Sequence, residues 1–344
     1  MLVDVHAHAV PPEVVARLTR HGPRVGVEVV RRAGETWFDH RQGYRYPVGP
    51  AFTSVDTILS RMDRARLDHR ILSIPPTLFF YDLPGGEAAE LCSAINDALV
   101  AFANRGGGRL WAFITVPLQE PLAAAREVER SASHPVVKGV EIGTDAGGRA
   151  LDDQALAPFF QACEQAGLPV FLHPYYLGPK PGLEPYYLTN SIGNPLETTI
   201  AIARLIHGGV LERHPQLRVV LAHGGGFFPY QLGRLEHAFA VRPEPSATCD
   251  RPPSAYHDRI YYDSVLHLPA ALRYLVEVAG ADHVLMGSDD PFDMGTEDPA
   301  ALVEAARLEP DAREAVLGQS AIRLLGLTPA GRVADGRGRA GETG

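Results

Sequence analysis

Two histidines one residue apart stand near the start of the chain, where His6 and His8 end the short apolar run that begins at Leu2. Successive side chains of a β-strand point to opposite faces, so residues two apart share a face. If this run is a strand, both imidazoles project the same way from its carboxyl end. That arrangement suits two ligands of one metal ion. A lone histidine at a strand end is more often packed or solvated, so the pair needs partners elsewhere in the chain.

The elements that must position this pair alternate along the sequence. Seven further apolar segments have the length and composition of buried strands, and helical patterns follow them: residues 70–75, 110–116, 136–142, 169–172, 217–221, 259–262 and 284–286. Eight short strands, each followed by helix with no break in composition, predict an α/β fold, a single (β/α)₈ TIM barrel over residues 1–327. An open, doubly wound sheet is the alternative. It is disfavoured because no G-x-G-x-x-G sequence follows an early strand.

Three segments depart from this repeat. Residues 24–48 alternate valines with polar residues and then become aromatic, which predicts a small β insertion after the first strand and helix. About twenty residues rich in Gly, Pro and Tyr follow the fifth strand, and loops of this length are usually functional covers. Asn194 ends this loop, and we expect it to be the N-cap of the next helix, with Pro195 at the first helical position. The tail 328–344 is rich in Gly, Ala and Arg, and we expect it to be disordered.

Three more strand ends carry residues that can bind metal or move protons. His173 ends the fifth strand, His223 the sixth and Asp289 the eighth. In a barrel of this type the carboxyl ends of the strands form the active site, so these side chains should meet His6 and His8. Imidazoles with one carboxylate and an open position are typical of catalytic zinc, although the same ligands suit iron or manganese. The spacing alone does not choose between Asp289 and its neighbour.

The fourth strand offers two further candidates. A lysine that ends this strand can, once carboxylated, bridge two metal ions, but Lys138 lies near the start of the strand and should face the opposite rim. Glu141 lies closer to the carboxyl end and is a minor candidate for a ligand. We therefore expect one metal ion. The run His223–Gly226 is similar to the oxyanion loop of esterases, but the chain has no G-x-S-x-G nucleophile elbow, so we reject that interpretation.

Composition excludes several classes of partner. The net charge of −9, from 32 basic and 41 acidic residues, argues against a protein that binds nucleic acid or a membrane surface. Cys92 and Cys163 fall in helical patterns and are expected to be buried free thiols, as in a reducing compartment. Asp4 and His6 interrupt the first apolar run, so we expect no signal peptide, and no stretch is apolar enough for a membrane helix. We expect a cytoplasmic protein.

With these residues in place, the chain resembles the amidohydrolase superfamily, most closely the branch of aminocarboxymuconate-semialdehyde decarboxylase. The resemblance covers nearly all of residues 1–326. The motifs that carry it are Asp4–His8, Gly139–Thr144, Phe171–Pro174, Gly193–Thr199, Gly208–Glu212, Ala222–Gly226 and Gly287–Phe292.

The resemblance implies that the two histidines of the first strand, together with His173 and Asp289, would hold one Zn²⁺ and a water molecule. It selects Asp289 over Asp290, because the family pattern is G-[ST]-D. It also implies that His223 is the acid/base residue beside the metal ion. A transiently protonated Asp289 is the alternative proton donor.

The resemblance also bears on partners and substrate. Family members are often homodimers in which an arginine crosses into the neighbouring active site, and Arg242 matches that position, as Phe292 matches an aromatic residue of the pocket. The family's second carboxylate-binding arginine falls at Gly49, with Arg45 nearby but out of register, and an aromatic of the fifth-strand loop is replaced by Asn190. Loss of an arginine removes a planar, charged fork for a carboxylate. We therefore expect a relative of aminocarboxymuconate semialdehyde as substrate, not that compound itself.

The expected activity is metal-dependent, non-oxidative decarboxylation of an unsaturated or aromatic carboxylic acid. A hydrolase or hydratase acting on an ester, a lactone or an unsaturated acid would use the same residues, and its product would retain the carboxylate carbon. A non-catalytic metal-binding barrel is the third possibility. It is disfavoured because all four ligands and the acid/base histidine are present.

Overall fold

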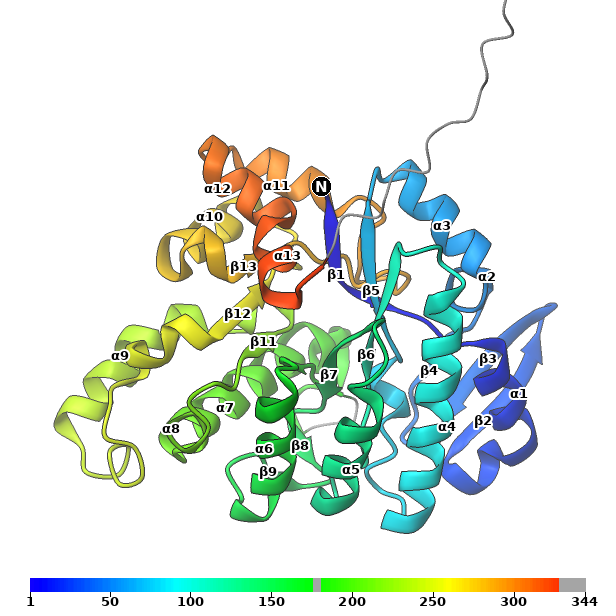
Figure 1. Cartoon of the computed structure of the whole chain (residues 1–344), viewed down its shortest axis with the longest axis horizontal. Helices are drawn as coiled ribbons and strands as arrows, with labels where there is room; N and C mark the ends of the chain where they lie inside the picture. Colours follow the sequence, from blue (N-terminus) through cyan, green and yellow to red (C-terminus); the bar gives the residue numbers. More distant parts are fainter. Residues whose placement is uncertain (176–180, 328–344) are drawn as a thin grey trace, which may run out of the picture.

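The central sheet of the computed structural model, which describes residues 1–175 and 181–327, closes on itself as a barrel (Figure 1). Its eight parallel strands are, in order around the sheet, β1 (Val3–His8), β5 (His69–Ser73), β6 (Leu110–Ile114), β7 (Val137–Ile142), β10 (Val170–Leu172), β11 (Val219–Leu221), β12 (Ile260–Asp263) and β13 (Val284–Leu285). The last strand returns to the first, because the Val5 N–H donates to the Met286 carbonyl at 2.9 Å and Ala7 bridges Asp290. The predicted TIM barrel is confirmed.

Helices pack around the outside of this sheet (Figure 1). Their bounds are α1 (Pro12–His21), α2 (Pro50–Thr53), α3 (Val55–Arg64), α4 (Gly85–Asn104), α5 (Pro121–Ser131), α6 (Ala157–Ala166), α7 (Asn194–His207), α8 (Val210–Arg213), α9 (Phe228–Val241), α10 (Pro269–Ala279), α11 (Pro299–Ala306), α12 (Pro310–Glu314) and α13 (Ser320–Leu325). Many begin with proline, whose fixed φ suits the first turn and whose missing N–H has no helical partner there. In α4 the apolar positions Leu91, Ile95 and Leu99 recur every four residues, so one face is buried against the barrel.

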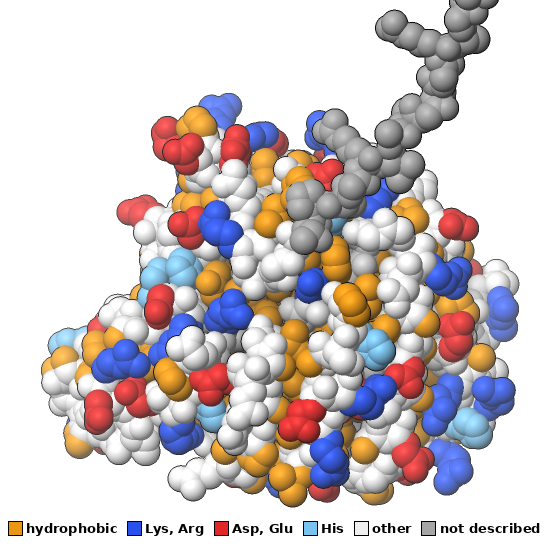
Figure 2. All heavy atoms as spheres, in the orientation of Figure 1, with side chains coloured by type: hydrophobic (Ala, Val, Ile, Leu, Met, Phe, Trp, Pro, Cys, Tyr) orange, Lys and Arg blue, Asp and Glu red, His pale blue; other side chains and the backbone are white. Residues whose placement is uncertain are grey.

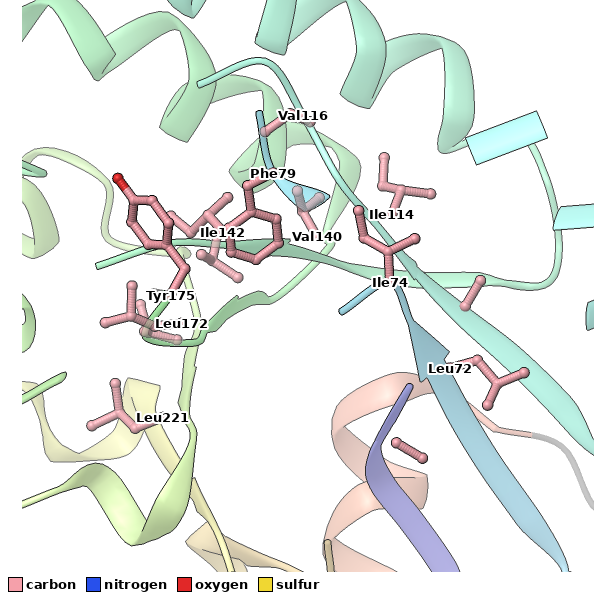
Figure 3. Packing of buried hydrophobic residues seen from close by; sticks show 14 of the residues in the cluster. Leu72, Ile74, Phe79, Ile114, Val116, Val140, Ile142, Leu172, Tyr175 and Leu221 are labelled. Atoms are coloured by element: carbon pink, nitrogen blue, oxygen red, sulfur yellow. The ribbon is translucent and has the colours of Figure 1, made fainter. Parts of the chain in front are cut away.

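The strands are buried on both faces, as parallel strands in such barrels are. Figure 3 shows part of the outer layer, where apolar side chains of neighbouring strands, among them Leu72, Ile114 and Val140, pack together. A separate cluster that includes Phe113 and Phe171 fills the inside of the barrel. Leucines of α13 belong to the same inner cluster and close the amino-terminal end of the barrel. The opposite end of the barrel, formed by the carboxyl ends of the strands, is therefore the end at which a functional site can form.

The predicted β insertion is also present, and it forms a wall beside the carboxyl ends of the strands. It is an antiparallel sheet of β2 (Val27–Arg32), β3 (Glu35–His40) and β4 (Arg45–Pro47). Phe38 and Tyr46 lie opposite each other on β3 and β4, and both are buried. The Tyr46 ring lies 5.3 Å from the ring of Phe292, which follows β13. A smaller hairpin, β8 (Asp145–Ala146) and β9 (Arg149–Ala150), follows β7.

One local prediction is wrong. Asn194 is not an N-cap, because residues Thr189–Gly193 already form a π-helical turn and Asn194 has helical angles (φ −60°, ψ −49°). Near the carboxyl terminus a π-helical turn at Ala315–Gln319, in which Gly318 leaves the helical region, separates α12 from α13. The predicted disorder of residues 328–344 lies outside the described residues.

Charge on the surface is mixed. On the face shown in Figure 2, acidic and basic side chains are interspersed over the helices. No helix among the described residues is long and apolar enough to cross a membrane.

Candidate metal centre and active-site pocket

Four side chains converge at the carboxyl ends of the strands. One ligand atom from each of His6, His8, His173 and Asp289 lies within 4.8 Å of the others, and all four residues are buried. The Nε2 atoms of His6 and His8 are 3.2 Å apart, and the Asp289 Oδ1 atom lies 3.4 Å and 3.1 Å from them. The His173 ring is 4.9 Å from the His6 ring and 5.4 Å from that of His8. The structure therefore brings together the residues that the strand ends indicated.

The remaining nitrogens of two imidazoles are held by carbonyl groups. His8 Nδ1 lies 3.2 Å from the Ile74 carbonyl oxygen, and His173 Nδ1 lies 2.6 Å from that of Pro174. In each ring the N–H on Nδ1 donates to the carbonyl oxygen. The Nε2 atom of the neutral ring then carries no proton, and its lone pair is free to bind a metal ion. This is the arrangement found around metal-ligating histidines, whose second nitrogen binds an oxygen that orients the ring.

Asp263 performs the same role for His6, and the sequence interpretation did not identify it. It ends β12, is fully buried, and its Oδ2 lies 2.6 Å from His6 Nδ1. Its other oxygen accepts from the backbone N–H groups of Gly224 at 2.8 Å and Val265 at 3.0 Å, so the carboxylate is fixed at both ends. Burial opposes its ionisation, but His6 and these donors hold the pKa of Asp263 below its ordinary value. The available signal was an acidic residue at the carboxyl end of the predicted seventh strand.

The electrostatics of the four residues are those of a cation site. Burial opposes ionisation of Asp289, but His6 and His223 keep its pKa well below the ordinary value. Burial also disfavours a charged His6, yet Asp289 and Asp263 raise the pKa of His6 to about 10. The pKa of His173 is well below its ordinary value, first because of burial, and its Nε2 has no hydrogen-bond partner among the described residues. A buried neutral imidazole nitrogen without a partner, beside a carboxylate, fits coordination of a divalent ion.

His223 lies beside the four residues and is not one of them. Its Nε2 is 3.5 Å from Asp289 Oδ2, and its ring is 4.9 Å from the His173 ring. The residue itself has a left-handed backbone (φ 55°), and the glycines that follow it continue the sharp turn. A Cβ on Gly226 would lie 2.1 Å from the Pro195 carbonyl oxygen, so this turn requires glycine. The glycine run thus has a packing role that holds His223 at the edge of the centre.

Asp290, the other carboxylate of the pair after β13, belongs to a buried ion-pair network. Arg70 is 1% exposed, and it donates to Asp4 at 2.9 Å and to Asp290 at 2.7 Å. Arg61 also donates to Asp290 through two nitrogens. The Ser288 hydroxyl donates to Asp4 at 2.6 Å, so the network ties the turn after β13 to β1. Because two arginines engage Asp290, Asp289 alone remains available to a metal ion.

A pocket of about 200 Å³ opens above the centre. Its described lining residues are Tyr44, Pro76, Thr77, His173, Pro174, Tyr175, Glu184, Tyr187, Thr189, Asn190, Asn194, His223, Asp289, Phe292, Asp293 and Met294. Phe292 packs edge-on against His8, with ring centroids 5.2 Å apart. None of these described lining residues is Lys or Arg. The cavity is large enough for one ring, with aromatic walls and the centre at its floor.

Comparison with known proteins accounts for this arrangement. The amidohydrolase family model matches residues 3–327. This chain belongs to the amidohydrolase family. It is 34% identical over 276 residues to the 2-amino-3-carboxymuconate-6-semialdehyde decarboxylase of Dictyostelium discoideum, with 80% of this chain and 77% of the relative covered.

Two solved structures extend the likeness. IDCase of Metarhizium anisopliae in its apo form superposes with a TM-score of 0.82 and 28% identity, covering 95% of this chain and 97% of that one. The 5-carboxyvanillate decarboxylase of Novosphingobium aromaticivorans, complexed with manganese and 4-hydroxy-3-methoxy-5-nitrobenzoic acid, has a TM-score of 0.80 at 20% identity, with 95% and 96% covered. At that identity the second likeness concerns the fold alone.

Of the residues that the family resemblance indicated for substrate binding, some line the pocket and others lie outside it. Phe292 and Asn190 line it. Arg242, directly after α9, is 63% exposed and pairs with Glu244 at 2.6 Å, and it is not part of the pocket of its own chain. Gly49 stands at the start of α2, also outside the lining.

The fourth barrel strand, β7, carries the two further candidates for metal ligands, Lys138 and Glu141. Lys138 lies at the start of the strand, with Nζ over the Trp111 ring at 4.7 Å, so the prediction that it faces the opposite rim is confirmed. Glu141 is not in the four-residue set. It is fully buried inside the barrel, and neither of its oxygens has a hydrogen-bond partner among the described residues.

Proposed function

We propose that this amidohydrolase is a metal-dependent carboxy-lyase, which removes CO₂ without oxidation from an unsaturated or aromatic carboxylic acid related to aminocarboxymuconate semialdehyde. The observation that carries the proposal is the buried His/His/His/Asp set with a separate histidine beside it, at the floor of an aromatic pocket. The relative from Dictyostelium discoideum, 34% identical to this chain, is a decarboxylase of an unsaturated acid, which supports the same class of reaction here.

His6, His8, His173 and Asp289 would hold one divalent ion, with Zn²⁺ as the first choice and iron or manganese as alternatives. When bound, such an ion supplies a Lewis acid for a carboxylate or an adjacent oxygen and lowers the pKa of a coordinated water toward ~7. The pocket adjoins these four residues, so a substrate carboxylate would approach the ion from the pocket side.

Loss of CO₂ leaves negative charge on carbon, so the site needs a proton donor on the pocket side. His223 Nε2 is the group that the geometry favours, because it lines the pocket and lies 3.5 Å from Asp289 Oδ2. Asp289, if transiently protonated, is the alternative donor. Phe292 and the tyrosines of the wall would hold the ring flat and exclude water from the reacting carbon.

The test is CO₂ release from a panel of hydroxybenzoic and carboxymuconate-type acids by the metal-loaded protein. His223→Ala should keep its metal content, since His223 is outside the ligand set, while CO₂ release falls by about 10²–10⁴-fold, the usual contribution of a general acid or base. The matched control is His21→Ala, because His21 is exposed at the end of α1 and lies neither in the pocket nor on α9. Consumption of substrate with incorporation of solvent oxygen and without CO₂ would replace the proposal by a hydrolase or hydratase.

We propose further that the protein is a homodimer in which Arg242 reaches the neighbouring pocket and binds an anionic group of the substrate. Apolar side chains are exposed on the same side of the molecule as α7 and α9: Ile200 (47%), Tyr230 (76%) and Val241 (58%). Such a cluster beside an exposed arginine is typical of a subunit interface.

Subunit mixing tests this arrangement directly. Arg242→Ala and His223→Ala chains should each be inactive alone. After mixing in equal amounts and exchange, half of the dimers carry one intact site, so activity should recover to about a quarter of wild type. No recovery, or a monomer by light scattering, would refute the shared site.

The domain and compartment assignments are also proposals. The family match over residues 3–327 supports one domain of 1–327. The free thiols of Cys92, Cys163 and Cys249 support a reducing compartment such as the cytoplasm.

A further inference from the structure

The π-helical turn that precedes α7, Thr189–Gly193, forms part of the wall of the active-site pocket. The Asn194 N–H donates to the Thr189 carbonyl, five residues earlier, so this turn is wider than an α-helical one. Thr189, Asn190 and Asn194 all line the pocket. Single π-helical turns occur frequently at functional sites. The polar side chains of this turn are therefore candidates for contact with the substrate.

The side-chain amides of Asn190 and Asn194 are free to bind a ligand. The Thr189 hydroxyl donates to the Leu183 carbonyl at 3.0 Å, whereas neither amide has a hydrogen-bond partner in the described part of the chain. Both asparagines are half-buried, and none of their amide atoms is among the buried polar atoms that lack a partner, so the amides are accessible to water. Each amide offers two N–H donors and a carbonyl acceptor.

Asn194 lies beside the turn that carries His223. Phe227, which ends the glycine run after His223, donates its N–H to the Thr199 hydroxyl at 2.8 Å. That hydroxyl donates to the Pro195 carbonyl at 2.8 Å. These contacts fix the first turn of α7 against the turn after β11. The Asn194 amide thus lines the pocket close to the proposed proton donor.

The remaining charges at the pocket are negative. Glu184 and Asp293 line it, and neither has an ion-pair partner within residues 1–175 and 181–327. Burial raises the pKa of Tyr187, and the charge of Asp293 raises it further, so this carboxylate acts on groups that line the pocket. A second carboxylate on the substrate would meet these negative charges, and like charges brought together are unfavourable. The pocket therefore favours an uncharged polar substituent.

We propose that Asn190 and Asn194 are specificity-determining residues that hydrogen-bond to a hydroxyl substituent of the substrate, so that hydroxylated monocarboxylic acids are preferred to dicarboxylic acids. This assignment rests on the proposed function. A hydroxyl both donates and accepts, as an amide does, so the two groups satisfy each other without a charge. The carboxylate that leaves as CO₂ is then the one anionic group of the substrate, available to the metal ion and to Arg242 of the partner subunit.

The experiment measures the binding of phenylphosphonates, whose phosphonate group replaces the reacting carboxylate and cannot leave as CO₂. Calorimetry on the metal-loaded protein compares phenylphosphonate with its 2-, 3- and 4-hydroxy derivatives and with its 3- and 4-carboxy derivatives. At least one hydroxy derivative should bind about five- to tenfold more tightly than phenylphosphonate, which corresponds to one net hydrogen bond. The carboxy derivatives should bind no more tightly than phenylphosphonate.

Variants then assign the preference to these residues. Asn190→Leu and Asn194→Leu keep the approximate size of the side chain and remove its hydrogen bonds. Each should reduce the preference for the hydroxy derivative, and the double change should abolish it while the affinity for phenylphosphonate stays the same. Asn104→Leu is the matched control, because Asn104 is exposed at the end of α4, outside the pocket. Asp293→Asn should tighten the binding of the carboxy derivatives.

The outcomes separate this inference from the proposed function. Equal affinity of the wild-type protein for phenylphosphonate and all three hydroxy derivatives would overturn the inference, even if the variants fail to fold. A preference that survives the double change, or tighter binding of a carboxy derivative than of every hydroxy derivative, would also overturn it. None of these results concerns CO₂ release. A preference that the double change abolishes, with no CO₂ released from any acid tested, would overturn the decarboxylase proposal and leave the role of the two asparagines standing.

Discussion

Replacement of Glu141 by glutamine should make the protein more stable at neutral pH. Glu141 lies on β7 in register with Phe171, inside the barrel beneath the metal centre. It is fully buried, and neither oxygen has a hydrogen-bond partner among the described residues. Burial raises the pKa of Glu141 well above its ordinary value, and the nearby His6 and Ser73 lower it only in part. The folded protein therefore holds this carboxyl group as the neutral acid, whereas the unfolded chain ionises it.

The size of the effect follows from proton linkage. An unfolded glutamate titrates near ~4.3, and between that pH and the higher pKa of the folded state the folded protein binds one more proton. The free energy of unfolding then falls by about 1.4 kcal/mol for each pH unit across that interval. The contribution of Glu141 is fully present below the unfolded pKa and is lost as the pH rises through the folded one. Glutamine has the same shape and does not ionise, so Glu141→Gln should not show this loss.

Urea denaturation of the metal-free proteins at pH 4, 5, 6 and 7 measures the difference. Glu127 is a matched control of opposite sign: Arg130, Asn96 and Ser93 hydrogen-bond it, and these contacts outweigh its burial and lower its pKa. Its stabilisation is present above the unfolded pKa and is lost as the pH falls through the folded one. Glu127→Gln should therefore destabilise the protein at pH 7 and less so at pH 4. Parallel curves for wild type and Glu141→Gln would refute the assignment of Glu141 as a buried neutral acid.

Two further substitutions test the supports of the centre. Asp263→Asn should weaken metal affinity about 10–100-fold in a chelator competition, because it removes the carboxylate that orients a ligand histidine; unchanged affinity would contradict this role. Arg70→Met leaves the buried Asp4 without a cationic partner and Asp290 with Arg61 alone, and should cost about 3–5 kcal/mol in urea denaturation. Arg323→Met, which breaks an exposed pair, should cost under about 1 kcal/mol, and equal costs for the two arginines would speak against the buried network.

The barrel and the convergence at its end were predictable because both follow from local patterns. Apolar runs of strand length alternate with helical periodicity, and parallel strands in a barrel must bring their carboxyl ends together. His6, His8 and His173 could therefore be grouped with the Asp289–Asp290 pair from their positions at strand ends, and the family pattern was needed to choose Asp289. Asp263 also lies at the carboxyl end of a strand. No sequence motif, however, distinguishes a single acidic residue that orients a ligand histidine from an acidic residue on the surface.

The pocket walls were less predictable, because segments without periodicity build them. Tyr44 comes from the turn between β3 and β4, and Tyr187 comes from the loop after β10. Their positions depend on contacts between segments more than a hundred residues apart. The prediction for Asn194 failed for the same reason. The sequence Asn194–Pro195 is typical of an N-cap, but the loop before it forms a π-helical turn, so Asn194 lies inside the helical segment. We expect these walls to determine substrate preference, which is therefore the part of the function least accessible from sequence.

The choice between Asp289 and Asp290 shows what the structure adds to a motif. The family pattern selects Asp289, but it gives no physical reason. In the structure Arg61 and Arg70 offset the charges of Asp4 and Asp290, so this buried network is balanced within the protein. Asp289 has no arginine or lysine partner among the described residues and faces only imidazoles. A buried carboxylate in that position calls for a cation from outside the chain, which is why the same pair of aspartates gives one structural residue and one metal ligand.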